Sequence, residues 1–456
     1  MTDLDIKSLF PPVTKAQWIQ QVQKDLRGQP FDSLKRTRPD GLAMEPFYTS
    51  DDLELLPLAE IQQAQDRSPG WLNVPNVRFQ SEAITNTVLR DELSKGADGL
   101  QLDLLGSRVD DLDWNRLLNG LKLSETPVWF AVSRQSETLV SILKARLPYQ
   151  LKGGILDELT GHLLTAGTVS EEALNQLVQA TRQTLDSPRF RTLTVDSSLF
   201  HNAGATATQE LAFTLNAVVE LYDFLTENGL SVEQIVPKTA LSVAVGTSYF
   251  TEIAKLRAFR ILWQRLISQY DSSFIHPLSP VFLHAQTSTF YDAAVTPDTN
   301  LLRATTEAMA AVIGGCDALT VHPYDAVFGE PDEFSRRIAR NVSILLKEEA
   351  HLDKTLDPAA GSYYLETLTA QLVKTAWSLF LAVENRGGLR RAFTDGFVPE
   401  EIEKAYQATV EAVKTGRILV GVTKFRTSDE ALPKPAKPAE PSPAPLPERR
   451  LAEEFE

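Results

Sequence analysis

The stretches ALSVAV at Ala240–Val245 and VWFAV at Val128–Val132 decide the fold class. Both are nearly continuous apolar runs, the pattern of strands that are covered on both faces of a parallel sheet. Amphipathic stretches separate these runs from others of the same kind, which predicts repeated strand–helix units. The other candidate strands are Trp71–Val74, Leu100–Leu104, Gly153–Leu156, Thr192–Asp196, Val281–Ala285 and Ala318–His322.

Helical spacing fills the segments between these strands. Thr206–Leu225 and Ser248–Ile267 are two examples, and a third begins after Pro331–Asp332, a plausible start signal. In this third segment the spacing predicts an apolar face of Phe334, Ile338, Val342 and Leu345, with Arg336, Arg337, Glu348 and Glu349 facing water. Eight strand–helix units over roughly 260 residues predict an α/β fold, a TIM-type (β/α)8 barrel. An open, doubly wound sheet fits the same periodicity.

Two further regions flank the barrel pattern. Residues 1–65 contain one helical pattern, Lys15–Leu26, and are predicted to form an N-terminal arm. Residues 66–427 comprise the barrel and two extra C-terminal helices, predicted at Ser362–Gly388 and Pro399–Arg417. Residues 428–456 form a proline-rich linker or tail, with seven prolines between Pro433 and Pro447. Since such a linker normally leads to another domain, we expect one to follow it.

Composition excludes several classes of function. The 45 Lys and Arg against 60 Asp and Glu give a net charge of −15, which disfavours binding to nucleic acid or to an anionic membrane. The single cysteine, Cys316, excludes an internal disulfide, and the six scattered histidines form no metal-ligand pattern. No run of 18 apolar residues and no signal-peptide order is present, so we expect a cytoplasmic protein.

Candidate site residues lie where the predicted strands end, because parallel barrels carry their chemistry at that edge. His284 and Gln286 alternate on one strand and should face the same side, although His284 fits a structural, hydrogen-bonded histidine better than a ligand. Asp103 and Asp196 are a weak candidate for a carboxylate pair. Cys316 is more plausible as a small buried side chain than as a nucleophile. The remaining polar residues at these ends are Ser133, Thr247 and His322.

Six stretches carry a resemblance to a known family. The chain resembles the adenosylcobalamin-dependent acyl-CoA mutases, above all methylmalonyl-CoA mutase, over roughly residues 1–427. The opening LFPPVTKAQWIQQVQKDLRGQPFDSL looks specifically like the small, non-catalytic subunit of the heterodimeric bacterial enzyme. The six stretches are His201–Leu215, Tyr249–Trp263, His284–Ser288, Arg337–Glu349, Asp357–Thr369 and Leu419–Phe425.

The resemblance also implies which site residues are missing. Asn76 stands where catalytic chains carry a tyrosine, Leu199 where they carry a histidine that contacts the thioester, and Phe282 where they carry an arginine. The D-x-H-x-x-G motif, whose histidine ligates cobalt, is absent from all 456 residues. We therefore expect no catalytic, cofactor-binding or metal-binding residue on this chain, and adenosylcobalamin on a partner subunit.

The expected function is a partner role. The resemblance implies a non-catalytic small subunit that forms a heterodimer with, and stabilises, the catalytic large subunit. That partner would bind the acyl-CoA and interconvert methylmalonyl-CoA and succinyl-CoA. The alternative is the substrate-barrel chain of a split acyl-CoA mutase, which takes its cobalamin domain from another chain.

Overall fold

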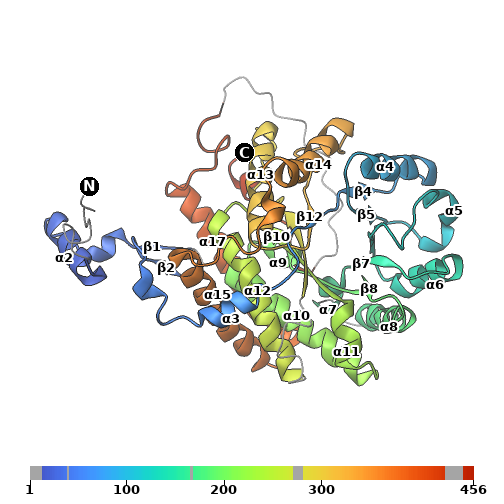
Figure 1. The fold of residues 1–456 in the computed structure, drawn as a ribbon, viewed down its shortest axis with the longest axis horizontal. Coiled ribbons are helices and arrows are strands. Elements are labelled where there is room, and N and C mark those ends of the chain that lie inside the picture. Colours follow the sequence, from blue (N-terminus) through green and yellow to red (C-terminus); the bar gives the residue numbers. More distant parts are fainter. Residues whose placement is uncertain (1–12, 39–40, 165–167, 271–280, 427–444) are drawn as a thin grey trace, which may run out of the picture.

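The computed structural model describes residues 13–38, 41–164, 168–270, 281–426 and 445–456 (Figure 1). Within these ranges the chain is mixed α/β, with two five-stranded parallel sheets. One sheet has the strand order β3 (Leu72–Asn73), β12 (Ala318–Thr320), β11 (Phe282–Thr287), β10 (Thr239–Val245) and β9 (Leu193–Asp196). The other has the order β4 (Asn76–Arg78), β5 (Leu100–Asp103), β6 (Val128–Val132), β7 (Lys152–Asp157) and β8 (Arg189–Arg191).

The two sheets are linked through the chain at both ends. Only Val74 and Pro75 separate β3 from β4, and only Thr192 separates β8 from β9. Every one of the eight predicted strands is present, with ends shifted by one or two residues. The Val128–Val132 prediction is matched residue for residue, and all five of its residues are buried.

Helices cover the outer faces of both sheets (Figure 1), and the apolar core forms several clusters that follow the two sheets only in part. One buried cluster includes Leu100, Phe130 and Ile155 from β5, β6 and β7 together with residues of α4 and α6. A larger cluster includes residues of β9 to β12 with α10, α12 and α15. The helices between strands are α4 (Glu82–Ser94), α5 (Trp114–Leu117), α6 (Ser136–Arg146), α7 (Leu159–Leu164), α8 (Thr168–Gln183), α9 (Ser198–Asn202), α10 (Ala207–Glu227), α11 (Val232–Ile235), α12 (Tyr249–Tyr270) and α13 (Pro297–Ile313).

After β12 the chain continues with α14 (Glu333–Glu348), α15 (Tyr363–Glu384), α16 (Leu389–Thr394) and α17 (Phe397–Lys414). The predicted extra C-terminal helices therefore exist. Residues 427–444 of the predicted linker lie outside the described residues, but Leu451 and Ala452 beyond it are buried beside Phe290 and Tyr406. Within the described ranges, no helix is long and apolar enough to cross a membrane.

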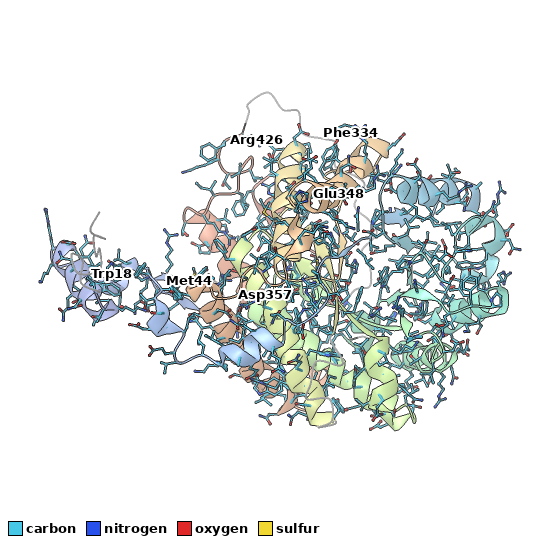
Figure 2. All side chains as sticks on the ribbon, in the orientation of Figure 1. Trp18, Met44, Phe334, Glu348, Asp357 and Arg426 are labelled. Carbon is cyan, nitrogen blue, oxygen red and sulfur yellow. The ribbon has the colours of Figure 1, made fainter. Side chains whose placement is uncertain are left out.

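The predicted arm contains α2 (Lys15–Asp25), a short hairpin of β1 (Arg36–Thr37) and β2 (Ala43–Met44), and then α3 (Leu58–Gln63). Its first part, α2, extends away from the body (Figure 1), whereas Leu42 of the hairpin and Ile61 of α3 belong to the larger apolar cluster. Thr14 begins α2 with a capping box, yet no residue of this helix is buried. Trp18 packs against two other aromatic residues of the arm, with ring centroids 6.2 Å from Phe31 and 5.0 Å from Phe47. Figure 2 shows Trp18 far from Asp357 in the body of the molecule.

The predicted inner face of α14 is only partly right, because Val342 packs against the larger apolar cluster. Phe334 and Leu345 are 50% and 49% exposed, and Phe334 lies at the surface in Figure 2. The buried residues are Leu346, Arg340 and three small side chains, Ser335, Ala339 and Ser343. These let the helix approach closely, so that Trp71 Nε1 donates to Ser343 Oγ at 2.9 Å.

Candidate functional site

A cavity of about 310 Å³ lies at the carboxyl ends of the strands. Its walls come from both sheets, including Gln101 of β5, Ala131 of β6, Thr194 of β9 and Gln286 of β11. Four carboxylates line it: Asp157, Glu158, Asp196 and Glu448. None of the described residues that line it is a lysine or an arginine. The cavity therefore presents mainly hydrogen-bond acceptors and negative charge.

The structure brings some of the predicted site residues together and separates others. Asp196, Gln286 and His322 line the cavity, and burial raises the pKa of the Asp196 carboxyl. Asp103 does not join Asp196, because it lies outside the lining and faces Arg78 at 3.6 Å. The predicted carboxylate pair is thus not formed. Ser133 and Thr247 are also absent from the lining. Cys316 is buried as predicted, and burial raises the pKa of its thiol to about 12.

An aromatic stack occupies the space between the two sheets. Trp129 on β6 lies with its ring centroid 5.7 Å from Phe282 and 6.3 Å from His284, both on β11, and its ring is nearly parallel to each. The Arg191 guanidinium lies 4.0 Å from the Phe282 ring centroid. Because β6 and β11 belong to different sheets, these contacts pass through the interior between them. Large side chains therefore fill the interior beyond the cavity.

Several polar atoms in this interior have no hydrogen-bond partner among the described residues. They are Asn76 Oδ1, Gln101 Oε1, Trp129 Nε1, Thr194 Oγ1 and His284 Nδ1. His284 Nε2 lies 2.8 Å from Thr320 Oγ1, as expected for a hydrogen-bonded structural histidine. Burial, together with nearby His322, lowers the pKa of His284 to about 3, so its imidazole is neutral at physiological pH.

The three positions where the resemblance implies lost site residues lie around this interior. Phe282 belongs to the aromatic stack, and Asn76 has one of the unpartnered oxygens. Leu199 lies on the short helix α9 and packs against the larger apolar cluster. At these positions the chain therefore offers no histidine, arginine or tyrosine to hold a thioester.

Two buried polar clusters join residues from three of the six stretches that carry the resemblance. Arg257 of α12 pairs with Asp357 and with Glu366 of α15 at 2.9 and 3.1 Å. Lys255 of α12 pairs with Glu210 of α10 at 2.7 Å. The members of these clusters are up to 109 residues apart, so no local sequence pattern predicts the clusters. A charged residue within an otherwise apolar helix face, such as Arg257 in α12, is the sequence signal that could have indicated these clusters.

The last described segment reaches the cavity through Glu448, which is one of the lining residues. Asn202 Nδ2 donates to Glu448 Oε1 at 3.4 Å, the Arg449 N–H donates to the Asn202 carbonyl, and the Leu451 N–H donates to the Phe290 carbonyl. A cavity of this volume is at the low end of the roughly 300–1,000 Å³ of small-ligand pockets and is much too small for a corrinoid. The residues present therefore do not fit adenosylcobalamin at this edge.

Comparisons with known proteins identify the family. A model of the methylmalonyl-CoA mutase family matches residues 107–451. The methylmalonyl-CoA mutase small subunit of Porphyromonas gingivalis is 32% identical over 92% of this chain and 70% of its own length. The small subunit of Streptomyces virginiae is 31% identical over 99% of this chain and 77% of its own length. The large subunit of Streptomyces virginiae is 28% identical over 92% of this chain and 63% of its own length. This chain therefore belongs to the methylmalonyl-CoA mutase family, and its similarity to the small subunits extends over most of its length.

Proposed function

We propose that this chain is the non-catalytic small subunit of a heterodimeric, adenosylcobalamin-dependent methylmalonyl-CoA mutase. Its partner, the large subunit, would bind the cobalamin and interconvert methylmalonyl-CoA and succinyl-CoA. This chain would stabilise that partner. The observation that carries the proposal is the Trp129, Phe282 and His284 stack, which fills the interior that a thioester would need to enter.

The replaced side chains support the same conclusion. A leucine at position 199 cannot donate a hydrogen bond to a thioester carbonyl, and a phenylalanine at position 282 supplies none of an arginine's five donors. The cavity carboxylates also disfavour the substrate, because a carboxyacyl-CoA carries its own carboxylate and phosphates. The negative charges of the substrate and of the cavity carboxylates repel one another, and no lysine or arginine among the described lining residues offsets this repulsion.

We further propose that the two sheets form one closed, eight-stranded barrel. The strand pairing supports closure. β3 pairs with β12 and runs on along the chain into β4, the first strand of the other sheet, and β8 at the far edge of that sheet runs on into β9. Each consecutive pair of strands from β4 to β8 and from β9 to β12 is parallel and hydrogen-bonded.

The arm is the surface that we assign to the partner. Its helix α2 buries no residue in this chain, while Val13, Phe47 and Leu55 are 69%, 46% and 92% exposed. An exposed apolar segment that projects from the body is typical of an interaction surface. Trp18 lies at its centre, and tryptophan is among the residues that most often dominate binding energy.

Native mass spectrometry of the complex purified from its own cells tests the proposal. We expect a one-to-one assembly with a larger chain that carries cobalamin, visible in the optical spectrum. Trp18→Ala should weaken the assembly by about 30-fold, equivalent to the roughly 2 kcal/mol of an interface hot spot. The matched control is Leu302→Ala, which removes a 70%-exposed apolar side chain from α13 and should leave the affinity unchanged.

Two results would contradict the proposal. One is mutase turnover by this chain with only a small cobalamin-domain chain, which would establish the split enzyme. The other is recovery of the chain free of any large subunit under conditions where mutase activity is intact.

A further inference from the structure

A serine, a histidine and a glutamate form a chain of side-chain contacts that begins at the edge of the cavity. Ser288 Oγ is 2.8 Å from His201 Nε2, and His201 Nδ1 is 3.3 Å from Glu210 Oε2. The three residues come from different elements, since Ser288 follows β11, His201 lies on α9 and Glu210 on α10. All three are at least nine-tenths buried. A hydroxyl, a base and a group that orients the base are the parts of an activated nucleophile.

The surrounding charges fix where the protons lie. Lys255 Nζ is 2.7 Å from Glu210 Oε2, and Ser197 Oγ donates to Glu210 Oε1 at 2.6 Å. Burial opposes ionisation of Glu210, but Lys255 and His201 outweigh it and lower the pKa of this carboxyl to about 2. A carboxylate only accepts hydrogen bonds, so His201 Nδ1 must donate to it. In the neutral imidazole, Nε2 is then the acceptor for the Ser288 hydroxyl.

Ser288 also faces space for a substrate. It lines the 310 Å³ cavity together with Thr289. The Phe290 N–H donates to Ser288 Oγ at 3.1 Å, which makes the hydroxyl a better proton donor. The N–H of Thr289 has no hydrogen-bond partner among the described residues. A backbone N–H without a partner directly after the nucleophile is one of the donors from which an oxyanion hole can be built.

The lining limits which molecules enter. Asp157, Glu158, Asp196 and Glu448 contribute carboxyl groups, and the Gln101 Oε1 and Thr194 Oγ1 atoms are unpartnered inside the cavity wall. A ligand that donates hydrogen bonds would satisfy these acceptors, whereas an anion would be repelled. Small acyl compounds that are uncharged or positively charged suit the site, and CoA thioesters do not.

We propose that Ser288, His201 and Glu210 form an active site on this chain, which hydrolyses small uncharged or cationic esters. This activity is separate from the partner role proposed above. Ser288 Oγ attacks the ester carbon, and its proton passes to His201 Nε2 while the carbonyl electrons move onto oxygen. When the carbon–oxygen bond to the alcohol breaks, the alcohol leaves with that proton. Water then attacks the acyl-serine and gives a proton to His201, which returns it to Ser288 as the carboxylic acid leaves.

A neutral alkyl fluorophosphonate tests this site on the full chain, alone and in the complex with its partner. The reagent is attacked at phosphorus by an activated serine, which displaces fluoride, and peptide mass spectrometry locates the adduct. We expect the adduct on Ser288 and no adduct at that position in Ser288→Ala. His201→Gln should slow labelling by about 100-fold or more, the usual contribution of a general base. Ser378→Ala, which removes an exposed serine of α15, should leave the rate unchanged.

His201→Gln should still fold, because Glu210 keeps Lys255 and Ser197 as partners. Circular dichroism checks this, and Ser288→Ala provides an independent variant. Hydrolysis of p-nitrophenyl acetate by the unmodified chain should be lost in the same two variants. The proposal is wrong if Ser288 reacts no faster in the folded chain than in urea, or if His201→Gln, shown to be folded, labels at the original rate.

Discussion

Replacing Arg257 with leucine should destabilise the chain more than almost any other single change. Five hydrogen bonds leave its guanidinium, two to Asp357 at 2.9 and 3.0 Å, two to Glu366 at 3.1 Å and one to Thr369 at 3.1 Å. A guanidinium has five N–H donors, so each one is used. Arg257 and Glu366 are fully buried. Leucine would therefore leave Glu366 as an unpaired buried charge and would release Asp357 from its place at a positive φ of 42°.

The expected loss is about 3–5 kcal/mol in the free energy of unfolding, the usual cost of removing one partner from a buried ion pair. Urea unfolding of the full chain, followed by circular dichroism, measures it. Arg337→Leu is the matched control, because that guanidinium is at the surface over the Phe334 ring and should cost less than about 0.5 kcal/mol.

The double variant Arg257→Leu/Glu366→Leu separates the two contributions. Since it removes the stranded charge, it should be more stable than Arg257→Leu alone. A loss below about 1 kcal/mol for Arg257→Leu, or strict additivity of the two changes, would refute the reasoning.

Three other changes are informative. Gly153→Ala should abolish soluble expression, because φ is +105° and the new Cβ would lie 2.0 Å from the Val128 carbonyl oxygen. The control is Gly106→Ala, whose new Cβ meets no atom within 4 Å and which should yield folded protein. Stability in urea should fall as pH drops from about 6.5 towards 3. His284 should contribute up to about 1.4 kcal/mol per pH unit to this fall, because the unfolded state binds a proton there that the native state, with its pKa of about 3, does not. His284→Gln should remove that share of the slope. Cys316, with its buried thiol at a pKa of about 12, should resist Ellman's reagent at pH 8 until the chain is unfolded; rapid reaction of the native chain would contradict this.

The sequence was sufficient where burial alone determines the structure. Val128–Val132 and Ala240–Val245 are strands because both of their faces are covered, and a continuous apolar run reports that condition directly. It was insufficient for α14, where Ser335, Ala339 and Ser343 are buried together with Leu346 while Phe334 and Leu345 are exposed. Periodicity of hydrophobicity cannot detect such a face.

The site was predicted only in part, for a related reason. The ends of the strands indicated Asp196, Gln286 and His322, which do line the cavity. The contact between Ser288 and His201 spans 87 residues, and Glu448 reaches the cavity from beyond the proline-rich segment. Such contacts depend on how distant segments pack, which no local pattern records.

The division of the apolar core has a consequence for how the chain opens. The strands β4 to β8 contribute to one buried cluster and β9 to β12 to another, whereas α8 contributes to both, through Leu174 and Leu177 on one side and Ala180 on the other. We expect loss of packing in one cluster to leave most of the strand packing in the other intact. Amide hydrogens in β5 and β6 should exchange with solvent in one cooperative event, and those in β10 and β11 in another. Such exchange would define two cooperative units, or foldons, within the chain.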